Sequence, residues 1–168
     1  MMLSSIRGAG FLVCLFVFLL PAAAGTTDDV GIARMALCQD SWADWQKASP
    51  DKLKAMAARI NAGFSHKDND PFAVPKAPVT IAGLGVLQLY PESVGMAVGF
   101  SVLVDAPFDK ARAVFERMLG KRLRRCESSD GMKSCELEIA DKRTFMLMTE
   151  DGAEKPATLV GCYYYYEK

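Results

Sequence analysis

Apolar residues recur at three- and four-residue spacings in three segments of this sequence, and this pattern predicts three helices. The first expected helix covers residues 28–47, with one apolar face made of Ile32, Met35, Cys38, Trp42 and Trp45. The second begins at Ser49-Pro50-Asp51, which supplies a capping serine and a proline at the first helical position, and ends near Gly63. The third covers residues 107–119, has the broadest apolar stripe and is closed by Gly120.

Strand patterns dominate the second half of the chain. The polar, proline-interrupted stretch from Ser65 to Pro78 is expected to be an irregular connector. The expected strands are 79–81, 84–90, 94–104, the two arms of a hairpin around residues 130–131, 143–149 and 157–166. The order of elements predicts an α+β fold, in which an antiparallel sheet of about five to seven strands is packed by an amphipathic helix and preceded by two N-terminal helices.

One face of the expected strand 94–104 is made of small residues, Gly95, Ala97, Gly99 and Ser101. Small residues in a strand favour the close approach of another element. We expect a helix to pack there, and the helix 107–119 is the best candidate because it follows directly in the chain.

The N-terminus has the pattern of a secretory signal peptide. Arg7 is its only charge, an apolar run covers residues 11–20, and Ala22-Ala23-Ala24 offers small residues for cleavage after residue 24. A membrane-spanning helix needs about twenty apolar residues, so this shorter run predicts no permanent membrane anchor. We expect residues 1–24 to be a signal peptide, residues 25–168 to be a single α+β domain, and the protein to be periplasmic or secreted.

Acidic and basic side chains are nearly balanced in the chain. The sequence has 20 Lys and Arg and 20 Asp and Glu, and removal of Arg7 with the signal leaves one acid in excess. Nucleic-acid binding needs a surplus of cations to neutralise phosphates. We therefore expect no nucleic acid among the partners.

Four cysteines follow the expected cleavage point, and an even number in an exported chain predicts two disulfides. Asp130-Gly131 is a favoured pair for a two-residue hairpin turn, and centring the hairpin there places Cys126 opposite Cys135 at a non-hydrogen-bonded pair. By elimination, Cys38 pairs with Cys162.

A basic cluster, Lys121, Arg122, Arg124 and Arg125, occupies the stretch after the third helix. It is a candidate surface for an anionic ligand. The structural alternative is that Lys121 and Arg122 complement a helix C-terminus and that Arg125 faces Glu136 across the hairpin. The same register would place Arg124 on the face of the apolar Leu137 and Ile139, which requires a bulge or a side chain reaching past the sheet edge.

Four consecutive tyrosines, Tyr163, Tyr164, Tyr165 and Tyr166, end the last expected strand and alternate across it. Their outward members are a second candidate recognition surface. The alternative is that they fill the core and the strand surface, since tyrosine is favoured in strands.

The sequence carries no nucleophile, phosphate-binding, dinucleotide or zinc-protease motif. His66, the single histidine, lies near Asp68 and Asp70 without the further acids and glycine of a calcium loop, and a solvated loop is the simpler interpretation. We expect no catalytic, cofactor or metal residues.

The expected function is that of an exported, noncatalytic binding or inhibitory module acting on an envelope protein or a cell-wall polymer. The alternative is a small exported hydrolase that uses two carboxylates, which would require a cleft with two inward acids about 5–10 Å apart.

Overall fold

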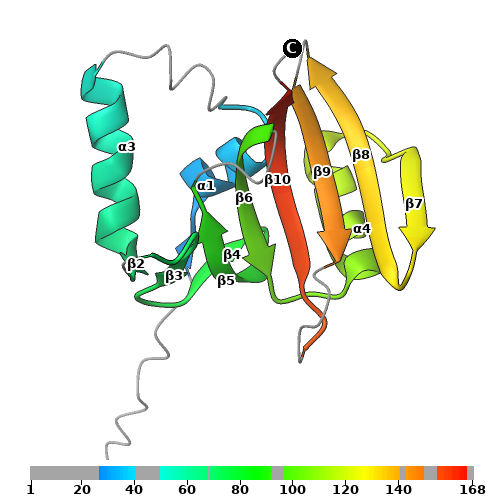
Figure 1. Ribbon diagram of the computed structural model, residues 1–168, viewed down its shortest axis with the longest axis horizontal. Helices are drawn as coiled ribbons and strands as arrows, with labels where there is room; N and C mark the ends of the chain where they lie inside the picture. Colours follow the sequence, from blue (N-terminus) through cyan, green and yellow to red (C-terminus); the bar gives the residue numbers. More distant parts are fainter. Residues whose placement is uncertain are drawn as a thin grey trace, which may run out of the picture.

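The computed structural model describes residues 27–40, 50–67, 69–91, 97–140, 143–149 and 155–165, and these form an α+β fold (Figure 1). The expected signal peptide therefore lies outside the described residues. In chain order the elements are β1 Thr27–Asp28, α1 Val30–Ala36, α3 Pro50–Gly63, β2 Phe64–His66, β3 Ala73–Pro75, β4 Val79–Ile81, β5 Leu84–Tyr90, β6 Ala97–Val104, α4 Phe108–Leu119, β7 Arg125–Ser129, β8 Met132–Ala140, β9 Arg143–Thr149 and β10 Thr158–Tyr165.

The strands of the described residues form one sheet in the order β1-β4-β5-β6-β10-β9-β8-β7. The β2–β3 hairpin joins it through β3 and β5. Every pairing is antiparallel except that of β1 with β4. The antiparallel class is confirmed, although the ten strands exceed the five to seven expected because short segments near the N-terminus also pair.

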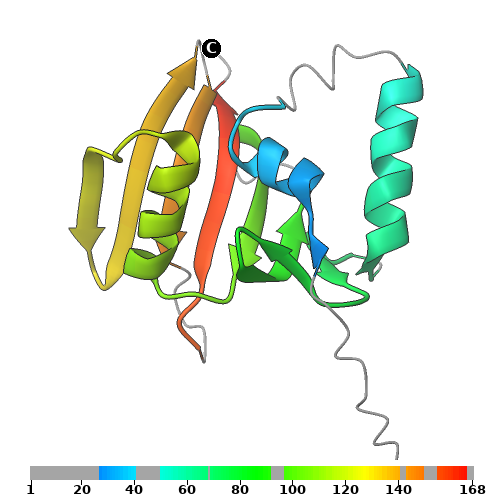
Figure 2. The ribbon, with the colours of Figure 1, turned by 180° about the vertical axis from the view of Figure 1, so that it is seen from behind.

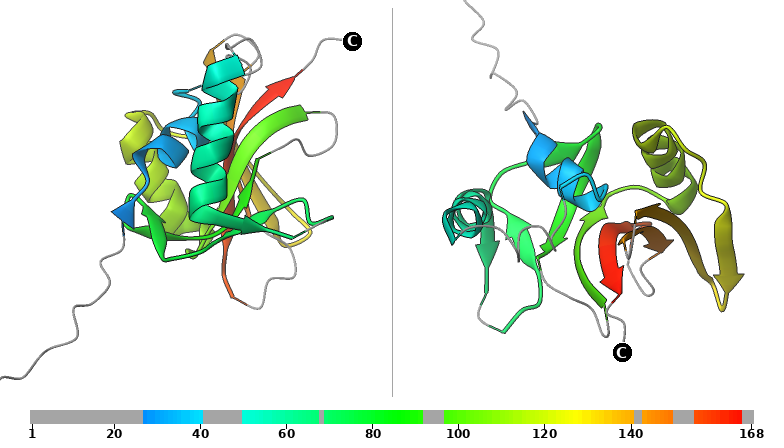
Figure 3. Two further views of the ribbon diagram at one scale, coloured as in Figure 1. Left: turned by 90° about the vertical axis from the view of Figure 1, so that its left-hand side faces the viewer. Right: turned by 90° about the horizontal axis from the view of Figure 1, so that it is seen from above.

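Helices α1 and α4 lie on the same side of the sheet, as Figure 2 and the view from above in Figure 3 show. The apolar face of α4 packs on that side, with the rings of Phe115 and Phe145 6.0 Å apart. Phe145, Cys162 and Phe100 are neighbours across three strands, so they share this face and form its core. Helix α3 stands to one side, next to β2.

The small-residue face of β6 does not receive a helix, and that expectation was wrong. Gly99 and Ser101 alternate with Phe100 and therefore face away from α4. The ring of Tyr163, directly opposite Gly99 on β10, occupies the space instead: a Cβ built on Gly99 would lie 2.7 Å from Cδ1 of that ring. The small side chains thus accommodate a neighbouring strand. Gly95 lies outside the described residues.

Two local expectations also need correction. The first helix ends at Ala36, well before residue 47, because Cys38 adopts a left-handed conformation with φ 58° that turns the chain toward β10; residues 41–49, with both tryptophans, lie outside the described part. The stretch expected to be irregular contains the β2–β3 hairpin, in which Phe64 pairs with Pro75 and Ala73 pairs with Leu89 of β5.

Two disulfides join the same cysteines that the sequence pairs. Cys126 and Cys135 lie opposite each other in the β7–β8 hairpin, with Cα atoms 4.0 Å apart, and Cys38 reaches Cys162 of β10 over a sequence separation of 124. Two disulfides fit an extracellular or periplasmic location.

Within the described residues, no helix combines the length and apolarity needed to cross a bilayer.

Candidate functional site: a charged groove beside β8

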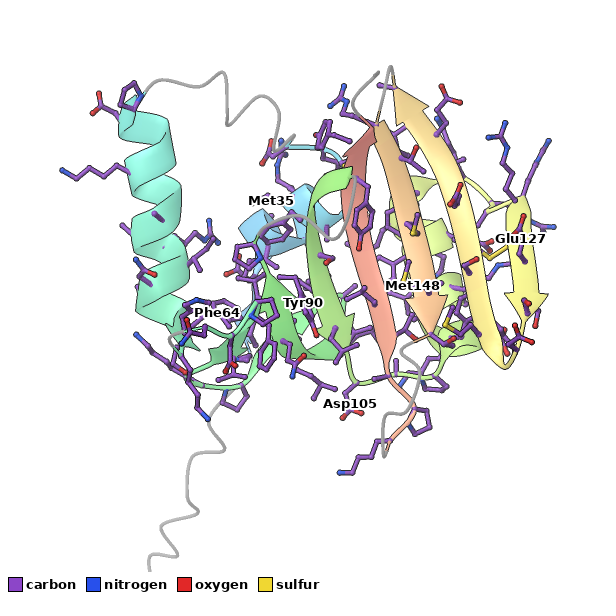
Figure 4. The ribbon with its side chains drawn as sticks, in the orientation of Figure 1. Met35, Phe64, Tyr90, Asp105, Glu127 and Met148 are labelled. Carbon is purple, nitrogen blue, oxygen red and sulfur yellow. A yellow bond between two sulfur atoms is a disulfide. The ribbon has the colours of Figure 1, made fainter. Side chains whose placement is uncertain are left out.

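A groove of about 560 Å³ runs between the loop that follows α4 and the final half of β8. Eight residues line it, and all four members of the basic cluster are among them: Gly120, Lys121, Arg122, Arg124, Arg125, Glu136, Leu137 and Glu138. The structure therefore brings the basic cluster together around one concave surface, next to the hairpin that carries Glu127 in Figure 4.

Two side chains of α4 hold the loop between α4 and β7 in place. Glu116 Oε1 accepts hydrogen bonds from the backbone N–H of Leu123 at 2.9 Å and from Arg112 Nε at 3.0 Å, while Arg112 donates to the Leu123 carbonyl at 2.9 Å. Leu123 itself is only 2% exposed. Its apolar side chain and both of its backbone polar groups are therefore held against the helix, and the loop has a defined path.

The C-terminal end of α4 directs the chain into this loop. Gly120 adopts a left-handed conformation with φ 63°, and its N–H bonds to the Arg117 carbonyl while that of Lys121 bonds to the Glu116 carbonyl. Glycine adopts this conformation without steric cost, so it commonly ends helices.

Anchoring Leu123 also explains why the groove exists. Because Leu123 is drawn toward α4, the chain joins β8 only from Arg125, which pairs with Glu136. Arg124 is exposed, precedes the strand and lines the groove together with Leu137, and the β7–β8 pairing contains no bulge. Figure 1 shows β8 extending past the start of β7. The groove is lined by Glu136, Leu137 and Glu138 of this part of β8.

The charges around the groove are not paired with one another. Among the described residues, ion pairs join Arg34 to Asp40, Arg59 to Asp29, Arg112 to Glu116 and Lys133 to Asp109. No ion pair within the same described part involves the basic cluster, and none joins Arg125 to Glu136 although these residues are directly opposite. Four cations therefore face solvent near two carboxylates and are available to a ligand.

Glu116 is held in its charged form. Burial is the largest single influence on its pKa and acts to raise it. Hydrogen bonds from the Leu123 N–H and from Arg112, with the charges of Arg112 and Arg122, together outweigh burial and lower the pKa. The anchor of the loop thus depends on an ionised carboxylate.

The tyrosines do not extend this surface. Tyr163 and Tyr164 are 5% and 7% exposed, so neither offers an outward phenol, and they are part of the core instead. The side chain of Tyr165 and the whole of Tyr166 lie outside the described part.

The two glutamates of the groove were not anticipated as site residues. Glu136 and Glu138 alternate with Leu137 on β8 and share one face of the strand, which a period-two pattern could have revealed. Their place in the groove, however, depends on where β7 begins. His66 lies on β2, where its Nδ1 is 3.1 Å from the Phe72 carbonyl, and no group of three metal-ligating side chains occurs among the described residues.

A second hollow, of about 370 Å³, lies between α1, the β4–β5 turn and α4. Ala33, Leu37, Ile81 and Met118 give it an apolar floor, and the charged groups at its rim, Asp29 and Arg34, are already engaged in ion pairs. The groove beside β8 is therefore the stronger candidate site.

In comparisons with known proteins, no family model, curated protein or solved structure matched the chain.

Proposed function

We propose that this protein is an exported, noncatalytic binding module whose groove beside β8 holds an acidic segment of an envelope protein. The observation that carries the proposal is the set of four unpaired cations around a groove whose loop is anchored by Glu116 and Arg112. A pre-ordered site loses little conformational entropy on binding, and arginine is enriched among the residues that dominate interface energies.

The mixed charge of the groove favours a protein segment over a uniformly anionic polymer. Glu136 and Glu138 lie among the cations and would repel a closely spaced row of negative charges. A peptide can place acids opposite the cations and neutral residues opposite the glutamates. Such a pattern of attraction and repulsion provides selectivity.

The environment expected for the module agrees with its covalent structure. The two disulfides persist in oxidising compartments, and one of them, Cys126–Cys135, closes the hairpin that borders the groove. A periplasmic or secreted location after removal of residues 1–24 is part of the proposal.

The groove supports a second candidate function, the carboxylate-based hydrolase. Glu136 and Glu138 lie two residues apart on one strand face, which places their Cα atoms about 7 Å from each other. A screen of glycoside and peptide substrates tests this alternative. Turnover that disappears in Glu138→Gln would replace the binding module by the enzyme.

The binding proposal is tested with an alternating acidic peptide, acetyl-(Glu-Val)3-amide, and its neutral analogue acetyl-(Gln-Val)3-amide. Each is titrated into the oxidised, isotope-labelled protein, and chemical shifts are followed by NMR. We expect the acidic peptide to bind at least tenfold more tightly and to shift the amides of residues 120–125 and 136–138.

Matched charge reversals locate the interaction. Arg124→Glu, in the groove, should weaken binding at least fivefold, whereas Arg117→Glu, equally exposed on α4 but outside the groove, should leave it within twofold. Equal affinity for the two peptides, or equal effects of the two reversals, would contradict the proposal.

A further inference from the structure

We infer that the acidic segment binds as an added β-strand, pairing its main chain with the open edge of β8 at Glu138. This inference rests on the proposed function, because it takes the same groove and the same acidic partner. It concerns the mode of recognition, which the basic cluster alone does not determine.

The hairpin turn establishes which backbone groups of β8 point toward the groove. Asp130 and Gly131 have φ values of 50° and 83°, the left-handed pair of a two-residue turn, so the flanking residues Ser129 and Met132 form a hydrogen-bonded pair. Hydrogen-bonded and non-hydrogen-bonded pairs alternate along an antiparallel ladder. Ser134, Glu136 and then Glu138 therefore direct their N–H and C=O groups toward the β7 side.

An independent contact supports this alternation. The N–H of Lys133 donates to Thr149 Oγ1 of β9 at 2.9 Å, so the odd-numbered position points to the opposite side of β8. The even-numbered positions then face β7, as the turn geometry requires.

At Glu138 this ladder has no partner in the part of the chain that the structure describes. The β7–β8 register ends at the pair Arg125 and Glu136, whereas β8 continues to Ala140. On the other side β9 stays paired as far as Ala140, opposite Arg143, which keeps this stretch extended. The free edge is thus an ordered template on which a short strand can be added.

The position of the free edge of β8 beside the basic cluster favours an acidic strand as the ligand. An added strand opposite Glu138 would lie along the groove, flanked by the four unpaired cations, so alternate acidic side chains would meet positive charge while the main chain pairs with β8. The register shift between Glu138 and Ala140 limits the template to a few residues, which fits a short linear segment rather than a long strand.

Backbone methylation of the acidic peptide tests strand addition directly. In an added strand, alternate N–H groups face β8 and the others face solvent. We expect N-methylation of one alternate set of residues in acetyl-(Glu-Val)3-amide to weaken binding at least tenfold, and N-methylation of the other set to change it less than threefold. If both sets are tolerated, or both abolish binding, strand addition is wrong.

A pair of protein variants gives a second measurement. Glu138→Pro removes the N–H that faces the groove without removing a β8–β9 hydrogen bond, whereas Glu138→Gln removes only the charge. We expect the proline variant to bind the peptide at least tenfold more weakly than the glutamine variant, with unchanged β9 and β10 amide shifts. Equal binding would overturn strand addition and leave charge-based binding intact, whereas failure of the unmodified acidic peptide to bind would refute the proposed function itself.

Discussion

Substitution of Glu116 by alanine should test the anchoring of the groove most directly. The variant deprives the buried Leu123 N–H of its acceptor, and an unsatisfied buried amide costs about 1–3 kcal/mol. It also removes the partly exposed ion pair with Arg112, which is worth at most about 1 kcal/mol. We therefore expect Glu116→Ala to lower the free energy of unfolding by about 2–3 kcal/mol.

For a domain of this size the loss corresponds to a fall in Tm of about 4 °C per kcal/mol, so about 8–12 °C in a thermal melt followed by circular dichroism. Because the loop at 120–125 would no longer be held, the acidic peptide should also bind at least threefold more weakly. Glu138→Gln is the control: it changes an exposed groove carboxylate without an anchoring role and should stay within about 0.5 kcal/mol of wild type.

The ionisation of Glu116 adds a pH signature to this prediction. Its pKa is lowered in the folded protein, so the charged form stabilises the fold above the pKa of an unfolded glutamate, about 4.3, and this contribution is lost as pH falls through the folded pKa. The stability difference between wild type and Glu116→Gln should be full at neutral pH and shrink in acid. A Glu116→Ala variant that melts within 1 °C of wild type, or a difference that grows in acid, would refute the anchoring argument.

Four further variants test the packing of the sheet and the contribution of its two disulfides. Gly99→Val should destabilise the protein by about 1–3 kcal/mol in urea unfolding, since a Cβ there would lie 2.7 Å from the Cys162 carbonyl oxygen; wild-type stability would show that β6 and β10 are not so closely packed. Tyr164→Phe should keep or raise Tm by up to about 4 °C, since the buried Tyr164 hydroxyl has no hydrogen-bond partner among the described residues; a clear loss of stability would reveal a partner. Replacing the Cys38–Cys162 pair by serines should cost more than replacing Cys126–Cys135, about 4.9 against about 2.7 kcal/mol at most, because the closed loop is far longer; the reverse order in chemical denaturation would contradict this ranking.

The parts of the fold that the sequence predicts well are those governed by local chemistry. The Asp130-Gly131 turn determines the register of its hairpin, so the position of Cys126 opposite Cys135 follows from counting outward. Helix α4 is equally predictable from the sequence, because its apolar stripe marks the face that packs on the sheet and the glycine at residue 120 marks its end.

Other features depend on tertiary contacts that periodicity does not reveal. The β2–β3 hairpin forms in a polar, proline-containing stretch because Ala73 pairs with Leu89, a residue on another strand. The basic cluster is a feature of the sequence itself, but the groove exists because Glu116 binds the backbone of Leu123, seven positions later, so that β7 begins only at Arg125. The proposed role of Glu138 follows only from this late start of β7, which leaves Glu138 without a pairing partner on that side among the described residues.

The position of β10 has a consequence for how the chain acquires its structure. This strand is the last described element in the sequence, yet it lies in the middle of the sheet between β6 and β9. A nascent chain lacking its final residues would have two separate half-sheets, each with an exposed edge. Completion must therefore wait for the C-terminal strand, and because its pairing with β6 joins residues distant in sequence, this closing step is expected to be slow. Such late assembly would keep the polypeptide unfolded, and able to cross a membrane, until its synthesis is finished. Oxidation of Cys162 with Cys38 would then link β10 covalently to the segment that follows α1.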